Sequence, residues 1–210
     1  MKSVVKKKVG NFNKKVEMNP KDYKDSAMKR IVLLTILLGL ALGARGQHSD
    51  GIDDLLQHAP MASVFVLKAC DFENTTSWAE LALTAAASYT VAAGVAYSLK
   101  QIVAEQRPDK SDRRSFPSGH ATFAFAGATM LHHEFGQVSP WVTIGGYGVA
   151  TLTAVDRIVR DRHYLHDVCA GAAIGFGATE LTYYLKKKFI KSDRVDLSFT
   201  GQSLYLALRW

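Results

Sequence analysis

The chain has 210 residues, of which 48% are hydrophobic, and its formal net charge is +7. A chain of this length has enough apolar material for one domain with a sizeable core. Residues 1–30 hold ten Lys and Arg against three Asp and Glu, and the rest of the chain carries equal numbers of each sign. Because the excess positive charge is confined to the leader, the composition argues against a nucleic-acid partner.

Residues 1–46 are predicted to be an N-terminal extension and a signal peptide. Lys29-Arg30 precede a short apolar run, Ile31 to Leu42, and Ala44-Arg45-Gly46 supplies small residues around a cleavage site. These are the three parts of a secretory signal. The alternatives are a core helix or an uncleaved anchor, although the run is short for a membrane span. Met28 offers a second start, which leaves open whether residues 1–27 are translated.

Residues 47–190 are predicted to form one helical domain. Apolar periodicity and helix-start and helix-stop signals place helices at about 51–70, 78–104, 117–135, 141–156 and 163–188. Helices joined by short connections usually pack antiparallel. The expected fold class is therefore all-α, an antiparallel bundle of about five helices.

Residues 191–210 form a tail of different character. Val195, Leu197 and Phe199 alternate with polar residues, and the same alternation returns in residues 204–210 after a turn-like segment, Thr200 to Ser203. Period-two alternation on both sides of a turn is typical of paired strands. The tail is predicted to be a short C-terminal β-hairpin.

Three short motifs carry the chemistry, and antiparallel packing of the helices would bring them to one end of the bundle. They contain cations, two histidines, a carboxylate and a Ser-Gly turn, the groups needed to bind and attack a phosphate. If the helix continues past residue 100, the first two cations lie two turns apart on one face. The motifs are Lys100 with Arg107-Pro108, Pro117-Ser118-Gly119-His120, and Arg157 with His163 and Asp167.

This pattern, Lys-x6-Arg-Pro, then Pro-Ser-Gly-His, then Arg-x5-His-x3-Asp, resembles the signature of the type 2 phosphatidic acid phosphatase superfamily. That superfamily also includes bacterial class A acid phosphatases and vanadium haloperoxidases. Three motifs in the same order with matching internal gaps are a specific signal. One position departs from the pattern: Asp156 stands where the family usually has Ser, next to the Arg of the third motif.

The resemblance implies a role for each motif residue. His163 attacks phosphorus to give a phosphohistidine, Asp167 orients His163, and His120 protonates the departing oxygen and later activates water. The remaining residues bind the phosphate oxygens, and no metal or cofactor is needed because cations replace it. These substrate-binding residues are Lys100, Arg107, Arg157, Ser118 and Gly119.

The other histidines are expected to be structural. His166 lies in a His-x-x-His-Asp sequence that could be mistaken for a metal cluster, but no further Glu or Cys stands at ligand spacing. We therefore expect no metal site.

The sequence thus predicts a metal-independent phosphatase of the bacterial envelope that hydrolyses phosphate monoesters or pyrophosphates of lipids. Phosphatidic acid, phosphatidylglycerol phosphate, undecaprenyl pyrophosphate and lipid A are all candidate substrates. The cluster Lys186 to Lys188 would lie at the end of the bundle opposite the site, so the positive-inside rule directs the site to the periplasm. Inner-membrane attachment is favoured over a soluble form. The alternatives are a soluble broad-specificity acid phosphatase, a vanadate-dependent haloperoxidase and a non-catalytic anion-binding protein; the oligomeric state is left open.

Overall fold

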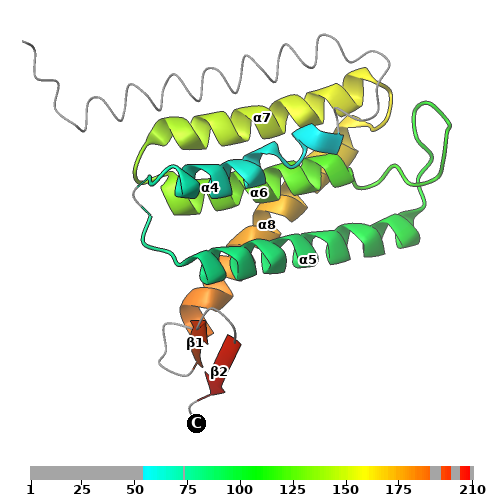
Figure 1. Ribbon diagram of the computed structural model, residues 1–210. Coiled ribbons are helices and arrows are strands. Elements are labelled where there is room, and N and C mark those ends of the chain that lie inside the picture. The colour runs from blue at the N-terminus through cyan, green and yellow to red at the C-terminus, as the bar shows by residue number, and fades with distance from the viewer. Residues whose placement is uncertain (1–53, 73, 190–194, 200–203, 209–210) are drawn as a thin grey trace, which may run out of the picture.

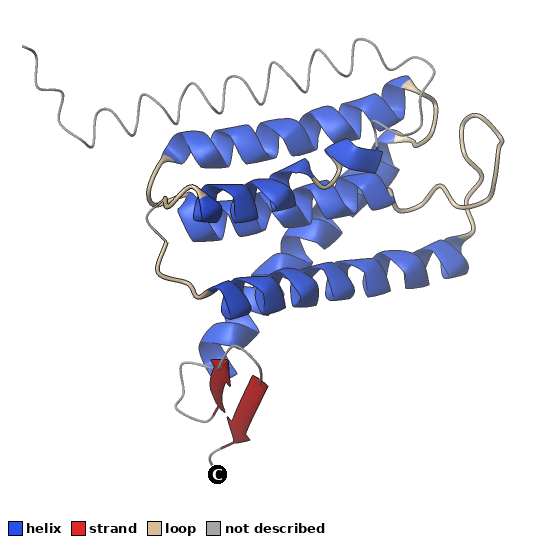
Figure 2. Cartoon of the chain, in the orientation of Figure 1, coloured by secondary structure: helices blue, strands red, loops and turns tan. Residues whose placement is uncertain are grey.

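The structure, a computed structural model, describes residues 54–72, 74–189, 195–199 and 204–208. The extension and signal peptide predicted in residues 1–46 lie outside this range. Five helices make up the bundle: α4 (Ala59–Ala69), α5 (Trp78–Val103), α6 (Gly119–Phe135), α7 (Pro140–Val159) and α8 (Leu165–Phe189). Helices account for nearly all the regular structure, as Figure 2 shows. The predicted all-α bundle is therefore confirmed.

Two strands follow the bundle, beyond the C-terminal end of α8 (Figure 1). Strand β1 (Val195–Phe199) pairs antiparallel with β2 (Leu204–Leu208), and Val195 lies opposite Leu208. They lie in the segment where the sequence predicts a hairpin. No part of the site depends on them.

The ends of the helices follow local sequence signals. Ser77 caps α5 by accepting a hydrogen bond from the Glu80 backbone N–H at 3.2 Å, with Glu80 in the first turn, which is the Ser-x-x-Glu capping pattern. Ser118 caps α6 by accepting from the Ala121 N–H. Helix α7 begins at Pro140, a residue suited to the first turn because it lacks an N–H. Helix α5 ends at Val103, since Ala104 adopts a left-handed conformation with φ 46°.

Helix α6 is the centre of the bundle and contacts each of the other four helices. The largest apolar cluster fills the space where α4, α5, α6 and α7 meet, and its fully buried members include Val64, Leu81, Met130 and Phe135. In Figure 1 the α5–α6 loop and the α7–α8 turn lie at the same end of the bundle. Segments 104–118 and 160–164, far apart in the sequence, therefore meet there.

Glycines set the distance between α6 and α8. A Cβ atom added to Gly175 would lie closer than 3.0 Å to backbone atoms of Thr122 and Ala126, and one added to Gly171 would meet the Ser118 carbonyl oxygen. Such contacts with backbone cannot be relieved by a side-chain rotation. The close approach also positions the site, because it brings the N-terminal turn of α8 against the N-terminus of α6.

Gly175→Ala is accordingly expected to destabilise the fold by about 3 kcal/mol, the upper part of the range for overpacking. The matched control is Gly177→Ala, two residues further along α8, where a Cβ atom would meet nothing within 4 Å. That change should stabilise the helix by roughly 0.5–1 kcal/mol, because alanine is a better helix former than glycine. Thermal unfolding followed by circular dichroism in detergent measures both. Equal shifts of Tm in the two variants would contradict this account of the α6–α8 contact.

Candidate active site

The centre of the site is a buried histidine and carboxylate at the α7–α8 turn. His163 is 3% exposed and Asp167 is fully buried, with 3.4 Å between His163 Nδ1 and Asp167 Oδ2. Backbone bonds from the N–H groups of Arg162 and His163 to the Arg157 carbonyl close the turn. Because Nδ1 faces Asp167, the other ring nitrogen, Nε2, is the one left to act as a nucleophile.

Asp167 also caps the helix that carries it. Its Oδ2 atom accepts a hydrogen bond from the Tyr164 backbone N–H at 2.8 Å, just before α8 begins. A carboxylate in the first helical turn that reaches back to the N-cap N–H is half of a capping box, and its charge suits the positive end of the helix. The same carboxylate therefore has a fixed position before any substrate arrives.

Ser115 holds Asp167 from the other side. This side chain is completely buried, and its hydroxyl donates to Asp167 Oδ2 at 2.5 Å. Its own backbone N–H donates to the Glu105 carbonyl at 2.9 Å, which anchors it in the α5–α6 loop. Sequence reasoning did not find Ser115, because its partner lies 52 residues further along the chain and only the fold brings them together.

Replacing Ser115 by alanine is expected to lower kcat by about 10- to 100-fold. A hydrogen bond to a charged group is worth about 1.5–3 kcal/mol, and Asp167 would lose the donor that fixes its orientation. The measurements are kcat and Tm. Ser98→Ala is the matched control, because Ser98 is an exposed serine that bonds only the Gly94 carbonyl of its own helix among the described contacts. A kcat for Ser115→Ala equal to that of Ser98→Ala would contradict the role of Ser115.

Lys100 ties the first motif to the second. Its Nζ donates to the carbonyl oxygens of Arg114 at 2.9 Å and Pro117 at 2.5 Å, so the end of α5 is joined to the segment that opens α6. Arg107, in contrast, lies in the loop, where its Nε donates to Asp112 Oδ1 at 2.8 Å. The condition under which Lys100 and Arg107 would share a helical face is not met, because α5 ends at Val103.

The cations nevertheless act on the same histidine. Burial lowers the pKa of His163. The positive charges of Lys100, Arg107 and Arg157 lower it further, whereas the negative charge of Asp167 raises it. The imidazole is therefore neutral at neutral pH, as a nucleophile must be. Arg157 lies in the last turn of α7 and is itself buried, with 6% of its surface exposed. Arginine is the cation best fitted to bind a phosphate at a buried position.

The second motif lies at the N-terminus of α6. Ser118 is fully buried, and its backbone N–H donates to the Asp167 carbonyl at 3.0 Å, which joins the second motif to the third. Around Gly119 there is open space where a side chain would project. The first N–H groups of a helix have no partner inside the helix and favour an anion. His120 follows on the same turn, with its Nε2 3.0 Å from Asp54 Oδ1, a contact that the sequence did not predict.

Contacts between the two loops complete the end of the bundle. Asp109 donates its backbone N–H to the Asp161 carbonyl at 3.1 Å, and its carboxylate pairs with Arg162 at 3.2 Å. Asp156, the residue that departs from the family pattern, forms an ion pair with Arg160 one turn along α7, at 3.4 Å. Its negative charge is therefore engaged on its own helix.

One group among the described residues combines metal-ligating atoms. Glu105, His166 and Asp167 each offer one such atom within 4.8 Å of the others. The histidines assigned to structure lie elsewhere: His132 contacts Thr143 and His133 pairs with Glu180, at the end of α6 far from its N-terminus.

A neutral, buried histidine beside a fixed carboxylate, with cations and a helix N-terminus around it, provides the groups that nucleophilic attack on a phosphate group requires. The comparisons with known proteins agree with that class. Residues 81–191 match the model of the PAP2 superfamily. The chain belongs to this superfamily, and the resemblance drawn from its motifs is confirmed.

Two bacterial relatives act on the same class of lipid according to their names. The chain is 35% identical over 144 residues to a lipid A 1-phosphatase of Porphyromonas gingivalis, covering 68% of this chain and 32% of that protein. It is 29% identical over 102 residues to a lipid A 4'-phosphatase of Helicobacter pylori, covering 48% and 50%. The chain thus spans a third to a half of the length of these relatives.

The names of two further matches refer to other lipid substrates. A decaprenylphosphoryl-5-phosphoribose phosphatase of Mycobacterium tuberculosis is 33% identical over 102 residues, covering 44% of this chain and 54% of that protein. A crystal structure of a transmembrane PAP2-type phosphatidylglycerolphosphate phosphatase from Bacillus subtilis superposes with a TM-score of 0.49 at 18% identity, covering 82% of this chain and 89% of that one.

Proposed function

We propose that the protein is a metal-independent lipid phosphatase that works through a phosphohistidine on His163. The observation that carries the proposal is the buried His163–Asp167 pair, surrounded by Lys100, Arg107 and Arg157. A site that only held phosphate would need cations and amides, but it would have no use for a neutral imidazole oriented by a carboxylate.

In the first step, His163 Nε2 attacks phosphorus and the bond from phosphorus to the lipid oxygen breaks. His120 gives that oxygen a proton, so that it leaves as an alcohol, or as a phosphate when the substrate is a pyrophosphate. Asp167 stabilises the positive charge on the phosphorylated imidazole. The cations, Ser118 and the backbone N–H of Gly119 bind the oxygens on which negative charge gathers.

In the second step, water attacks the same phosphorus from the side that the leaving group vacated. His120, now neutral, accepts a proton from the water, the bond from phosphorus to nitrogen breaks, and phosphate leaves. His120 is protonated again and His163 is neutral again, so both residues are ready for the next cycle. One residue thus serves as acid and then as base.

An apolar groove beside the site supports a lipid substrate. The groove has a volume of about 370 Å³, lies between α4 and α7, and is lined by residues that include Leu55, Val66 and Val149. Leu55, the lining residue that comes earliest in the sequence, directly follows Asp54, and Asp54 contacts His120. The groove therefore reaches a residue next to the contact of His120, the side of the site where the lipid part of a substrate would lie.

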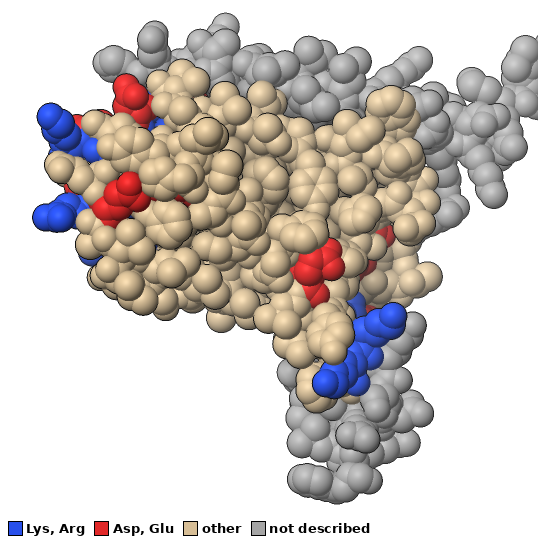
Figure 3. Space-filling view, turned by 180° about the vertical axis from the view of Figure 1, so that it is seen from behind, with Lys and Arg blue, Asp and Glu red and all other residues tan. Residues whose placement is uncertain are grey.

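The distribution of charge supports attachment to a membrane. On the face drawn in Figure 3, the charged side chains of the described residues gather in two separate areas, with a broad uncharged band between them. The stretches 81–99 of α5 and 140–155 of α7 contain no Asp, Glu, Lys or Arg. Within the described residues, α5 is the one helix that is long and apolar enough to cross a membrane. Many large apolar side chains face outward, among them Val95, Ile144 and Phe176.

The proposal includes an orientation in the membrane. The catalytic end holds the three motifs, whereas Lys186, Lys187 and Lys188 lie in the last turn of α8. The positive-inside rule counts Lys and Arg near the ends of membrane segments, and the catalytic end also carries such residues, so charge alone does not fix the orientation. A site that faces the periplasm rests instead on the predicted signal peptide, which would direct the chain out of the cytoplasm.

Phosphate release by the purified chain in detergent micelles tests the proposal. The panel is lipid A 1-phosphate, phosphatidylglycerol phosphate, phosphatidic acid, undecaprenyl pyrophosphate and p-nitrophenyl phosphate, each with EDTA present. We expect release from a lipid substrate that EDTA does not reduce, with lipid A 1-phosphate tested first because of the Porphyromonas gingivalis relative. Activity on p-nitrophenyl phosphate alone would favour a soluble acid phosphatase. Oxidation of bromide in the presence of vanadate and peroxide would favour a haloperoxidase.

A further inference from the structure

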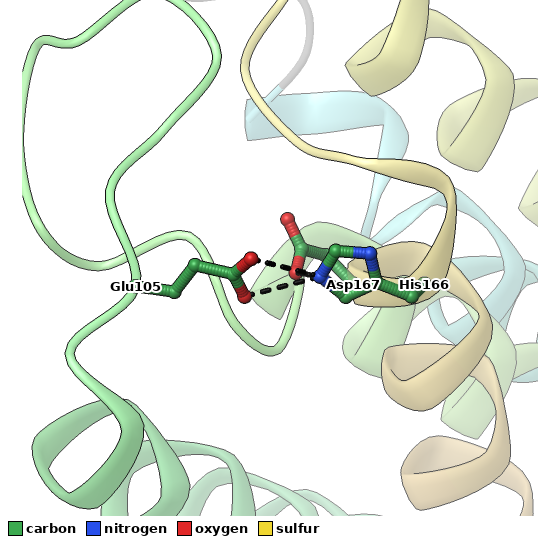
Figure 4. Close-up of side chains that lie close together, drawn as sticks. All are labelled: Glu105, His166 and Asp167. Carbon is green, nitrogen blue, oxygen red and sulfur yellow. Dashed lines mark hydrogen bonds and ion pairs between the residues drawn. The ribbon is translucent and has the colours of Figure 1, made fainter.

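Glu105, His166 and Asp167 form a cluster at the solvent side of the catalytic carboxylate. His166 Nε2 lies 3.0 and 3.1 Å from the two Glu105 oxygens and 3.2 Å from Asp167 Oδ1. Figure 4 shows Glu105 reaching from the α5–α6 loop towards the two residues in the first turn of α8. The sequence offered no third ligand near His166, but the fold supplies one from 61 residues away.

We propose that these three side chains bind one divalent transition-metal ion of the zinc class, and that the bound ion inhibits the phosphatase. The inhibitory part of the proposal rests on the proposed function; the binding part does not. The ion would be a regulator taken up from solvent and would take no part in the reaction.

The donor set fits such an ion. One imidazole nitrogen and two carboxylate oxygens are common zinc ligands, with bonds of about 2.0–2.2 Å, so ligand atoms around a tetrahedral ion lie about 3.3 Å apart. The three atoms here are already 3.0–3.2 Å apart along the contacts of His166. An ion could therefore enter the cluster with small side-chain movements and still keep a fourth position for water.

The buried ligand atom gives an independent reason to expect a ligand. Asp167 is fully buried, and its Oδ1 makes no hydrogen bond to any described residue, although Oδ2 accepts from Ser115 and Tyr164. A buried carboxylate oxygen without a hydrogen bond is costly unless a cation compensates for it. The only charged group that the described contacts place on Oδ1 is the His166 ring.

The exposed ligands make the site accessible and hold it in shape. The His166 side chain is 55% exposed and that of Glu105 30%, so an ion can enter from solvent. The His166 ring stacks on the Tyr164 ring, with 5.4 Å between the ring centroids and 9° between the ring planes. The centroid of the Phe116 ring lies 6.1 Å from that of His166. This stacking keeps Nε2 directed at the two carboxylates.

Neighbouring charge limits the affinity and explains the inhibition. Lys100 and Arg107 lie close enough to act electrostatically on the catalytic pair, and they oppose a further cation. An ion on Asp167 Oδ1 would draw negative charge away from Oδ2, the atom that faces His163. Asp167 would then stabilise the positive charge of the phosphorylated His163 less well, so the ion should lower kcat.

The test titrates ZnCl₂ against activity on the preferred substrate and, separately, against the protein in a calorimeter. The variants are His166→Ala and Glu105→Gln. The matched control is His133→Ala, which removes another partly exposed histidine paired with a glutamate, at 2.8 Å from Glu180 and at the other end of α6. We expect inhibition and binding of one ion in the wild type and the control. Both should weaken at least 10- to 100-fold in the two cluster variants, the loss that follows even removal of an outer-shell partner.

A His163→Ala protein separates the two proposals. It lacks the nucleophile but keeps all three ligands, so zinc should still bind to it, whether or not the chain proves to be a phosphatase. The metal site is overturned if zinc binds His166→Ala within about twofold of wild type, and the inhibitory role of the site is overturned if inhibition in that variant is unchanged. Inhibition that persists equally in every variant would mean that zinc acts on the substrate.

Discussion

His163→Ala should reduce kcat by about 10⁴-fold or more, because removal of a catalytic nucleophile leaves only the rate that binding and charge stabilisation provide. The variant should still bind substrate, since Lys100, Arg107 and Arg157 remain in place. The KM for a lipid substrate is therefore expected to change much less than kcat. Phosphate release in detergent micelles gives both constants.

The matched control for this variant is His132→Ala. His132 contacts Thr143 within the bundle, away from the three motifs, so its loss should leave kcat within a few fold. Circular dichroism must show the same helix content in both variants. If His163→Ala kept more than a tenth of wild-type kcat while it remained folded, another residue would have to be the nucleophile.

Asp167→Asn should lower kcat by about 10⁴-fold, the effect seen when the carboxylate that orients a catalytic histidine becomes an amide. Asparagine keeps the size of the side chain and one carbonyl oxygen, so it can still accept the hydrogen bonds from Ser115 and the Tyr164 N–H. The variant loses the negative charge that stabilises the positive charge on the phosphorylated His163. The defect should therefore appear in kcat with little change in helix content.

The comparison with Ser115→Ala shows whether charge or position matters more. That variant keeps the carboxylate and loses only one donor to it, so its defect should be at least tenfold smaller than that of Asp167→Asn. Equal defects would mean that the orientation of Asp167 dominates. Wild-type kcat in Asp167→Asn would rule out the assigned role of Asp167.

The positions of the helices, and the meeting of the three motifs at one end of the bundle, could be predicted from the sequence. Helix ends carried readable signals, such as Ser77 before α5 and Pro140 at the start of α7, and apolar periodicity located the spans between them. Short connections then forced neighbouring helices to run antiparallel. The catalytic roles themselves are still predictions, although the structure brings His163 and Asp167 together.

The partners of the motif residues could not be predicted. Ser115, Asp54 and Glu105 contact Asp167, His120 and His166 across 52, 66 and 61 residues, and nothing in their local sequence announces those contacts. The end of α5 was predicted to within one residue, but the left-handed conformation of Ala104 was not, because alanine is a helix former. Tertiary contacts of the loop outweigh the local preference at that residue.

The most direct test of the central claim is to look for phosphate on His163. His120→Ala should still react with p-nitrophenyl phosphate, because nitrophenolate leaves without a proton, but it lacks the base that activates water for the second step. We expect a burst of one nitrophenolate per protein and a slow steady rate. Mass spectrometry of rapidly quenched, alkali-treated protein should then find phosphate on the peptide containing His163. A burst without phosphate on that peptide, or with phosphate on another residue, would contradict the phosphohistidine mechanism.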